Sequence, residues 1–443
     1  MGSQGKPDDF ASKPISLAII GGGLAGLALT IGLLPYSQHI NTTIYEAAAE
    51  FAEVGVGVAF GPNAVRAMGL ISPDILKGFK KHATGNENAE RQNTWLSFRY
   101  GMESRNGNGK KYGDLIAHLE GGNLGEVLEK EGITTRSCIH RARFLEELAA
   151  LVPEGAAKFG KKLMEVEDLQ GGGVALRFTD GEEVVVDAVV GCDGVKSMTR
   201  PLVLGSDVVP KFTGEYAYRA LVPSHIARET LGDELALNGQ LYVGYGGYII
   251  TYPVEHGKFI NIAATRQKRD LNWDEENWII SSTKEDMAED YKGWGHNIIE
   301  LISRFEFRDK WAFFDLPHSQ MYYRGRLCLV GDSAHASTPH LGAGAGMAFE
   351  DAYILSNLLG TVKDSGEVEN AFRCFDAVRR GRSQNVIMAS RKSGKANCFE
   401  GEGIRDNLEM LEPDIEARYR WVWDFDLEAT LMKAKKMLLQ SPK

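Results

Sequence analysis

The first apolar segment of the chain has the length of a buried strand. Residues 15–20 are apolar or small and carry no charge, and three glycines and a second apolar stretch at 24–34 follow them. The uncharged run 15–34 is long enough to span a bilayer, but glycine triplets favour turns over helix interiors. We therefore predict a strand, a turn and a helix, followed by a second strand at 42–45. This order is typical of the strand–helix–strand unit that opens a doubly wound α/β sheet.

The middle of the chain has the pattern of a separate sheet. Residues 212–265 are rich in Tyr, Val and Ile, with turn residues between the apolar segments. Two of these segments, 248–253 and 259–264, are separated by Glu-His-Gly-Lys at 255–258. Such a spacing predicts two strands joined by a hairpin loop.

Three further segments have clear periodicity. Residues 141–151 place apolar side chains at helical spacing, and residues 184–190 read as one strand that only Asp187 interrupts. Residues 327–330 have buried-strand character and precede a glycine-rich loop. The loop leads into a helix, because Ala348 and the apolar residues after it return every three or four positions.

The tail of the chain carries one more apolar stripe at helical spacing. It consists of Leu427, Leu431, Ala434 and Leu438. A stripe of this kind is typical of a docking face, either within the chain or across a dimer. We accordingly expect a monomer or a homodimer.

These segments predict an α/β protein in which a β-rich domain is inserted into a discontinuous Rossmann-like domain, with helices at the C-terminus. The N-terminal residues 1–13 are polar and are predicted to be disordered. The predicted boundaries are 14–80, 105–196 and 316–395 for the nucleotide-binding domain, 81–104 and 197–315 for the substrate-binding β-rich domain, and 396–443 for the C-terminal helices.

Charge and cysteine usage narrow the class of protein. A formal charge of −10 argues against nucleic acid or an anionic membrane as a partner, because both select basic surfaces. The five cysteines are dispersed without a C-x-x-C pair, which opposes a disulfide framework and a structural zinc site. No secretory signal is visible, so a cytoplasmic protein without a membrane span is expected. His335 and His340 lack the H-E-x-x-H spacing, and no metal site is predicted.

The first glycine-rich turn carries a dinucleotide-binding pattern. Gly21-x-Gly23-x-x-Gly26 follows a predicted strand and opens a predicted helix, and Glu46 lies 20 residues further on. The glycines permit a tight turn, close approach of a pyrophosphate and close helix–strand packing, and the acid accepts hydrogen bonds from a ribose. A purely structural glycine turn would explain the glycines but not Glu46. The pattern alone does not choose between NAD and FAD.

Three later segments favour FAD over NAD, because they resemble segments of a known family. Residues 187–197, 324–335 and 339–347 resemble the "DG" segment, the "GD" segment and the following glycine-rich loop of the group A flavoprotein aromatic hydroxylases, which include salicylate hydroxylase. Their order and spacing fit from residue 15 to about residue 390. The resemblance implies a Rossmann-like FAD-binding domain.

The resemblance also implies roles for single residues. Glu46 would hold the adenosine ribose, Arg141 would face the FAD, and Asp332 would bind its ribityl or pyrophosphate part. An alternative for Asp332 is a helix N-cap, although this does not explain the loop that follows. The remaining cofactor-binding residues are Ala59, near the isoalloxazine ring, and Gly344, Ala345 and Gly346, whose N–H groups would face the flavin pyrimidine edge.

The family resemblance implies a reaction as well. The FAD would be bound non-covalently and reduced by NADPH or NADH, and O2 would give a C4a-hydroperoxyflavin that hydroxylates a small phenolic substrate. Alternatives are a related FAD epoxidase or a salicylate-type hydroxylase acting with decarboxylation. An NAD-dependent dehydrogenase or a flavin-binding regulator without a competent pocket would share part of the pattern.

Two residues of the β-rich region are the candidate catalytic groups. Arg219 is a charge on an apolar, aromatic strand, and Tyr252 follows it by 33 residues. This spacing resembles an Arg and Tyr pair of fungal dearomatising monooxygenases from azaphilone, tropolone and sorbicillinoid polyketide pathways. The resemblance implies that both residues position a phenolate, and that the substrate is a resorcinol-type aldehyde. The alternative is an ordinary strand arginine paired with a carboxylate and a tyrosine packed at a sheet edge.

Overall fold

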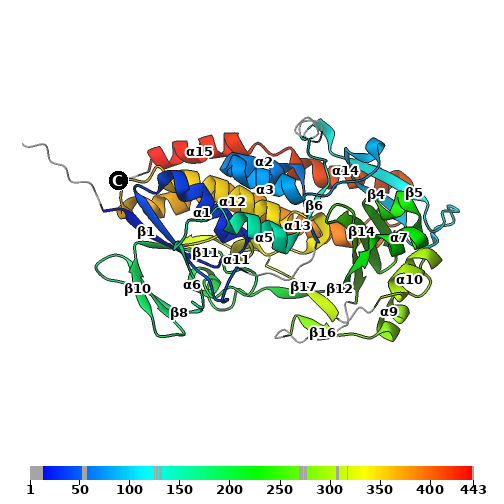
Figure 1. Ribbon diagram of the computed structural model, residues 1–443, viewed down its shortest axis with the longest axis horizontal. Coiled ribbons are helices and arrows are strands. Elements are labelled where there is room, and N and C mark those ends of the chain that lie inside the picture. Colours follow the sequence, from blue (N-terminus) through cyan, green and yellow to red (C-terminus); the bar gives the residue numbers. More distant parts are fainter. Residues whose placement is uncertain are drawn as a thin grey trace, which may run out of the picture.

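The computed structural model describes most of the chain, namely residues 13–51, 57–123, 125, 128, 132–268, 273, 277–305, 309–316 and 318–441. Residues 1–12 of the segment predicted to be disordered lie outside the described residues. Figure 1 shows a parallel sheet toward one end of the long axis and a larger sheet toward the other, with the long helices α12 (Gly344–Leu359) and α13 (Val368–Asn397) between them.

The parallel sheet contains the predicted strand–helix–strand unit. Its strand order is β18-β19-β11-β1-β2-β7, and all neighbouring pairs are parallel except β18 with β19. The central strand β1 is buried along almost its whole length, because α1 and α12 pack together over the sheet. The bounds are β1 Ile15–Ile20, α1 Leu24–Leu33, β2 Ile40–Tyr45, β7 Ala157–Lys158, β11 Ala188–Gly191, β18 Tyr323–Arg324 and β19 Leu327–Leu329.

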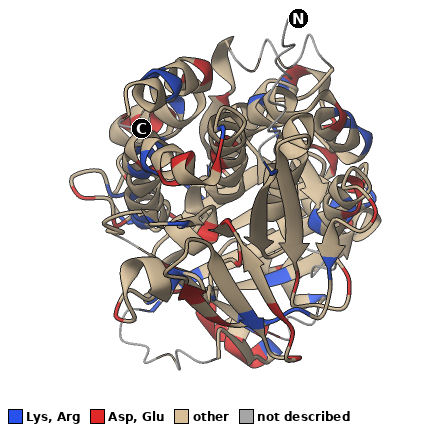
Figure 2. Cartoon of the chain, turned by 90° about the vertical axis from the view of Figure 1, so that its left-hand side faces the viewer, with Lys and Arg blue, Asp and Glu red and all other residues tan. Residues whose placement is uncertain are grey.

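The run at 15–34 is thus a strand, a turn and a helix, as predicted. Among the described residues, no helix is both long enough and apolar enough to cross a membrane. In Figure 2, basic and acidic positions are interspersed over the helices at this end of the molecule. This mixture differs from the continuous basic surface that nucleic-acid-binding proteins present.

The segment 184–190 is two strands, so its prediction as one strand is wrong. β10 (Glu183–Val186) joins a three-stranded antiparallel sheet with β9 (Val174–Phe178) and β8 (Leu163–Asp168), whereas β11 enters the parallel sheet. Asp187 lies at the break. Its carboxylate accepts hydrogen bonds from the backbone N–H of Ser16 at 2.8 Å and from its hydroxyl at 2.6 Å, which fixes the chain where it changes sheet.

The β-rich region forms most of an eight-stranded sheet of order β16-β17-β12-β15-β14-β13-β4-β5. The hairpin predicted at 255–258 is confirmed, and its turn uses positive φ angles at Glu255, His256 and Gly257. The strands are β4 Thr94–Tyr100, β5 Leu115–Glu120, β12 Lys211–Pro223, β13 Gln240–Gly244, β14 Gly247–Val254, β15 Phe259–Gln267, β16 Ile279–Ser281 and β17 Asp309–Asp315.

For two segments, the structure differs from the predicted domain assignment. β5 pairs with β4 and forms the edge of the eight-stranded sheet, although we assigned 105–196 to the nucleotide-binding domain. The helix α6 (Arg200–Leu204) buries Val203 in the core of the parallel sheet, although we assigned 197–315 to the inserted domain. In both cases the packing of the segment against distant strands decides to which part of the molecule it belongs. Boundaries drawn along the sequence do not include this information. The remaining boundaries stay a prediction.

The C-terminal helices pack onto the rest of the chain. In α15 (Leu427–Leu439) the residues Leu427, Leu431 and Ala434 are buried, and the helix contacts α12 and α13. The apolar stripe is therefore a docking face within the chain. The preceding helix α14 (Leu408–Trp423) contacts β5 and brings its buried aromatic side chains to the larger sheet.

Candidate active site

A cavity of about 610 Å³ lies between the carboxyl end of the parallel sheet and one face of the eight-stranded sheet. This volume and the convergence of two structural parts are typical of a ligand site. Ten of the twelve site residues predicted from the sequence line it, and the exceptions are Gly26 and Gly346. The ten are Gly21, Gly23, Glu46, Ala59, Arg141, Arg219, Tyr252, Asp332, Gly344 and Ala345.

The glycine turn after β1 forms one end of the cavity. Gly21 has a φ of +103°, a conformation that favours glycine, and Gly23 has open space where a Cβ would stand. A Cβ on Gly26 would lie 2.0 Å from the carbonyl oxygen of Gly21. Gly26 does not line the cavity. It lies where α1 packs against the turn, and its lack of a side chain permits this close packing. The three positions fit the three roles of a dinucleotide-binding turn.

Glu46 stands directly after β2 at the same end of the cavity. Its Oε2 accepts a hydrogen bond from the backbone N–H of Gly22, and its Oε1 accepts one from Ala48, both at 2.7 Å. These bonds fix the carboxylate beside the glycine turn. Each oxygen keeps a further lone pair that can accept from a ribose hydroxyl.

Asp332 is exposed toward the cavity on the short helix α11 (Asp332–His335). The N-cap of this helix is Gly331, and no side-chain capping bond is present, so the alternative role of Asp332 as an N-cap is excluded. The guanidinium of Arg200 donates to the backbone carbonyl of Asp332 at 2.9 Å and so fixes the turn. The carboxylate is left facing the cavity.

The N-terminus of α12 faces the cavity from the opposite loop. The helix begins at Gly344, and the first N–H groups of a helix have no acceptor within the helix. Gly344 and Ala345 line the cavity, whereas Gly346 faces α2 (Pro62–Ile71), where an added Cβ would lie 3.0 Å from Ala64. Gly346 thus permits close packing of the two helices.

Buried ion pairs hold the segments that carry Asp332 and Gly344 together. Asp351 on α12 accepts from the backbone N–H of Gly331 at 3.1 Å and from Arg379 Nε at 2.7 Å, and its carboxylate lies 2.5 Å from Nε2 of His335. The Arg379 guanidinium also pairs with Glu350 at 2.7 Å. All these side chains are at most 1% exposed. A buried charge needs such partners, and here the partners tie α11, α12 and α13 into one unit.

These features fit FAD. A glycine cradle with open space at Gly23, an acid beside it, a free carboxylate at Asp332 and the N-terminus of the 16-residue helix α12 follow one another along the cavity. A dinucleotide with a flavin at one end needs a pyrophosphate site, a ribose acceptor and N–H donors for the ring.

Replacing Asp332 by alanine is expected to lower FAD retention by about tenfold or more, because a charge-assisted hydrogen bond to the cofactor contributes about 1.5–3 kcal/mol. The measurement is flavin content after gel filtration. Asp193 is the matched control, since its carboxylate accepts from the backbone N–H groups of Met198 and Thr199 and holds its own turn. Asp193→Ala should lower the melting temperature, whereas Asp332→Ala should not. An unchanged flavin content in Asp332→Ala would contradict its role.

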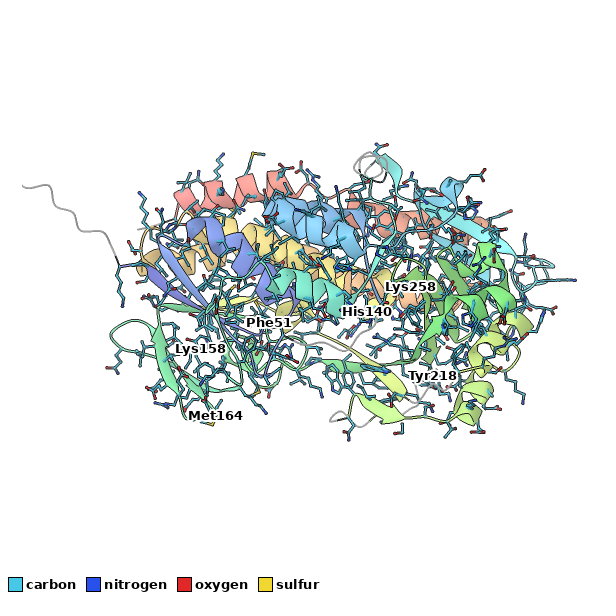
Figure 3. All side chains as sticks on the ribbon, viewed as in Figure 1. Phe51, His140, Lys158, Met164, Tyr218 and Lys258 are labelled. Atoms are coloured by element: carbon cyan, nitrogen blue, oxygen red, sulfur yellow. The ribbon has the colours of Figure 1, made fainter. Side chains whose placement is uncertain are left out.

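Ala59 and Arg141 meet where the two parts of the molecule join. Ala59 lies on β3 (Gly57–Phe60), which pairs with β6 (Ser137–His140), and Arg141 is the first residue of α5 (Arg141–Ala149). Figure 3 labels the preceding His140 close to this junction. Residues 52–56, which precede β3, lie outside the described residues. Both side chains border the middle of the cavity.

The other end of the cavity is one face of the eight-stranded sheet. Strand side chains alternate between faces, so Ala217 and Arg219 on β12 share a face with Ala263 on β15 and with Ile250 and Tyr252 on β14. The opposite face carries Tyr216, Tyr218, Tyr242, Ile249, Ile260 and Ile262 and packs on the helices α7 (Ser224–Leu231), α9 (Lys284–Asp290) and α10 (His296–Ser303).

Arg219 stands on the cavity face without an anionic partner. It makes no ion pair with any described carboxylate, its Nε has no hydrogen-bond partner, and its guanidinium lies 5.3 Å from the Trp311 ring. Burial lowers the pKa of Arg219 below its ordinary value, and the nearby Tyr252 opposes that effect. Within the described residues, the alternative of a strand arginine neutralised by a carboxylate is therefore not observed. An unpaired cation of this kind can bind an anion in the cavity.

Tyr252 lies on β14, an interior strand, so the alternative of a tyrosine packed at a sheet edge is wrong. Its hydroxyl donates to the carbonyl oxygen of Gly57 at 2.9 Å, and the guanidinium of Arg136 lies 4.5 Å from its ring centre. Burial raises the pKa of Tyr252 above its ordinary value, which keeps the phenol neutral. Donation to a substrate oxygen requires this O–H to turn away from Gly57.

Four polar side chains beside the substrate end were not predicted from the sequence. His340 was considered only as half of a metal pair, and the described residues contain no group of three or more potential metal ligands. Its place in the loop after residues 324–335 was the signal that could have identified it. The other three side chains lie on a strand or directly before one, and nothing in the sequence around them indicated a role in the site. They are Arg136, Glu215 and Tyr248.

Comparison with known proteins identifies the family. A model described as "FAD binding domain" matches residues 303–390. The chain is 38% identical to the 6-methylsalicylate 1-monooxygenase atA of Aspergillus terreus, with coverage of 94% of this chain and 91% of the relative. It is 34% identical to a salicylate hydroxylase of Pseudomonas putida, with coverage of 96% and 95%.

A solved structure agrees with these relatives. The chain superposes on a salicylate hydroxylase substrate complex with a TM-score of 0.82, at 31% identity, over 95% of this chain and 98% of that one. The same fold is present in a Klebsiella pneumoniae protein, HpxO, solved with FAD and uric acid, at 21% identity and a TM-score of 0.70. The NAD-dependent dehydrogenase and the non-enzymatic regulator are thereby excluded. The chain belongs to the salicylate hydroxylase family of FAD-dependent monooxygenases and is an aromatic hydroxylase.

Proposed function

We propose that the protein uses NADPH or NADH and O2 to add one oxygen atom to a phenolic ring whose phenolate is held by Arg219 and Tyr252. The observation that carries this proposal is the guanidinium of Arg219 on the cavity face of the sheet, which forms no ion pair with a carboxylate in the described part of the chain. A phenolate is more electron-rich than its phenol, so a cation that stabilises it activates the ring toward an electrophilic oxygen.

The residues of this chain position the ring and exclude water. Arg219 would bind the phenolate oxygen, and Tyr252 would donate a hydrogen bond to it after leaving Gly57. Leu241, Ile250 and Ala263 surround them with apolar surface, which strengthens the attraction between the cation and the anion. FAD, when bound, supplies the oxygen transfer after its reduction by the nicotinamide cofactor and its reaction with O2.

We propose a resorcinol-type polyketide aldehyde as the substrate and oxidative dearomatisation as the outcome. The 33-residue spacing of Arg219 and Tyr252 supports this class, because it resembles that of the fungal dearomatising monooxygenases. A second candidate is decarboxylating hydroxylation of a salicylate. It is favoured by the 38% identity to a protein named for 6-methylsalicylate.

Product analysis tests the two candidates together. The purified flavoprotein is incubated with NADPH or NADH and a panel of resorcinol-type aldehydes and salicylates, and the products are identified by mass and NMR. Dearomatisation adds one oxygen and keeps the ring substituents, whereas the second reaction adds one oxygen and releases carbon dioxide. If no phenol of the panel stimulates consumption of the reduced nicotinamide, the proposal fails.

A further inference from the structure

A chain of hydrogen bonds leads away from the substrate end of the cavity. The hydroxyl of Tyr248 lies 2.9 Å from Nδ1 of His340, and Nε2 of His340 lies 3.0 Å from Oε2 of Glu215. Tyr248 and His340 line the cavity, and all three side chains are buried. Glu215 accepts a further bond at 3.3 Å from the hydroxyl of Thr213, which is only half-buried.

The bonding pattern fixes the tautomer of His340. A carboxylate only accepts hydrogen bonds, so Nε2 of His340 must carry the hydrogen that points to Glu215. Nδ1 of the neutral ring is then an acceptor, and the hydroxyl of Tyr248 donates to it. Burial raises the pKa of Tyr248, so its hydroxyl stays protonated and can pass on a proton without itself becoming an anion.

The sheet register places Arg219 between two tyrosines. On β15, Ala263 pairs with Arg219 on one side and with Ile250 on the other, and Ile250 lies midway between Tyr248 and Tyr252. Measured along the strand direction, each tyrosine therefore lies about 7 Å from the position of Arg219. The Tyr252 hydroxyl donates to a backbone carbonyl, which is not a base, whereas the Tyr248 hydroxyl donates to an imidazole.

Among the described residues, the other groups packed around His340 provide no second carboxylate that hydrogen-bonds its ring. Tyr419 on α14 donates to the backbone carbonyl of His340 at 3.4 Å and not to its ring. From α13, Gly394 packs on the ring, and the nearby Arg391 pairs with Asp315 of β17. The ring of Phe313 on β17 lies edge-on at 5.6 Å. Among the described residues, Glu215 is thus the carboxylate that lies within hydrogen-bond distance of the His340 ring.

We propose that Tyr248, His340 and Glu215 form the path by which the phenol proton leaves the cavity. The substrate O–H bond breaks and its proton moves to the Tyr248 oxygen, while the Tyr248 proton moves to Nδ1 of His340. The result is a phenolate beside Arg219, a neutral Tyr248 and an imidazolium paired with the Glu215 carboxylate. No electron is transferred, and no other reactant is needed. This inference rests on the proposed function, because it assigns the proton of the same phenol.

The test uses the complete flavoprotein and 4-nitrophenol, whose phenolate absorbs visible light. Difference spectra against the same protein without the probe give the fraction of bound probe that is ionised at each pH. Three variants are compared: Glu215→Gln, its conservative partner Glu215→Asp, and Tyr248→Phe. Tyr242→Phe is the matched control, since Tyr242 is a fully buried tyrosine on the opposite face of the sheet whose hydroxyl has no hydrogen-bond partner among the described residues. Flavin content and melting temperature confirm that each variant is folded.

The direction in which the ionisation midpoint of the probe moves distinguishes a proton path from a purely structural role of the Glu215 and His340 pair. If His340 receives the proton, loss of the Glu215 charge leaves the imidazolium without its anionic partner, and the midpoint for probe ionisation rises by about one pH unit. If the Glu215 and His340 pair only ties the loop to β12, loss of a nearby negative charge favours the phenolate, and the midpoint falls. Tyr248→Phe should raise the midpoint as Glu215→Gln does, Glu215→Asp should restore it in part, and Tyr242→Phe should leave it unchanged.

The same variants separate this inference from the proposed function. With a substrate of the unmodified protein, Glu215→Gln and Tyr248→Phe are expected to slow product formation by about a hundredfold, and the pH optimum should move upward. If the unmodified protein hydroxylates a phenol but both variants ionise the probe as it does, the proton path is wrong and the proposed function stands. If the probe shifts appear but no phenol is hydroxylated, the proposed function is wrong and the path stands.

Discussion

Replacing Arg219 by alanine is expected to abolish product formation while FAD remains bound and reducible. Removing one preorganised group that stabilises developing charge typically lowers the rate by about 100-fold to 1,000-fold. The glycine turn, Glu46 and Asp332 lie at the other end of the cavity, so flavin content should not change. The measurements are flavin content, reduction of the flavin by NADPH or NADH without oxygen, and product yield with oxygen.

Two further substitutions sharpen this test. Arg219→Lys keeps the charge but not the planar fork of donors, and we expect it to restore only part of the activity. Arg304→Ala serves as the control, because Arg304 is an exposed residue on the far side of the sheet that pairs with Glu300 on its own helix surface. Without the phenolate site, reduced nicotinamide should be consumed with release of hydrogen peroxide instead of product. Normal hydroxylation by Arg219→Ala would remove this residue from the catalytic mechanism.

The second large effect is expected at Gly26. A Cβ at this position would lie 2.0 Å from the carbonyl oxygen of Gly21 and 3.3 Å from Cγ2 of Ile19, and neither the turn nor the strand can move away cheaply. Overpacking of this kind costs about 1–3 kcal/mol or more. We expect Gly26→Ala to lower the free energy of unfolding by that amount and to lose FAD, because the strained turn is the predicted pyrophosphate site.

Gly23→Ala is the matched comparison, because the same methyl group would meet no described residue within 4 Å. Its φ of −76° is also accessible to alanine. The variant should therefore fold with normal stability and still bind FAD more weakly, since the methyl group enters the space of the pyrophosphate. Chemical unfolding and flavin content measure the two effects separately. Equal behaviour of the two variants would contradict this division of roles.

The nucleotide-binding half was predictable because its signals are local. The turn at Gly21 to Gly26 follows its strand directly, and Glu46 stands at the end of the next strand, so spacing along the chain maps onto spacing in the fold. The segment 184–190 shows the limit. Its hydrophobic pattern is continuous, but the bonds from Ser16 to Asp187 divide it between two sheets, and those bonds join residues 171 positions apart.

The substrate end was only partly predictable. Arg219 attracts attention as a charge on an apolar strand, and Tyr252 was found through its spacing. Glu215 and Tyr248 read as ordinary strand residues, and His340 reads as part of a loop. Their relation exists only where β12, β14 and the loop before α12 meet, because none of them is close in sequence to its partner.

The sequence by itself determined the α/β class, the glycine cradle and its acid, the resemblance to flavin hydroxylases and the charge in the β-rich region. These features rest on periodicity, glycine conformation and motif spacing, which act over a few neighbouring residues. The tertiary structure alone decided that Arg219 pairs with no carboxylate among the described residues and that Tyr252 donates to Gly57. It also placed the hydroxyl of Tyr248 2.9 Å from Nδ1 of His340. Sheet register and packing between distant strands set these relations, and no local pattern encodes them.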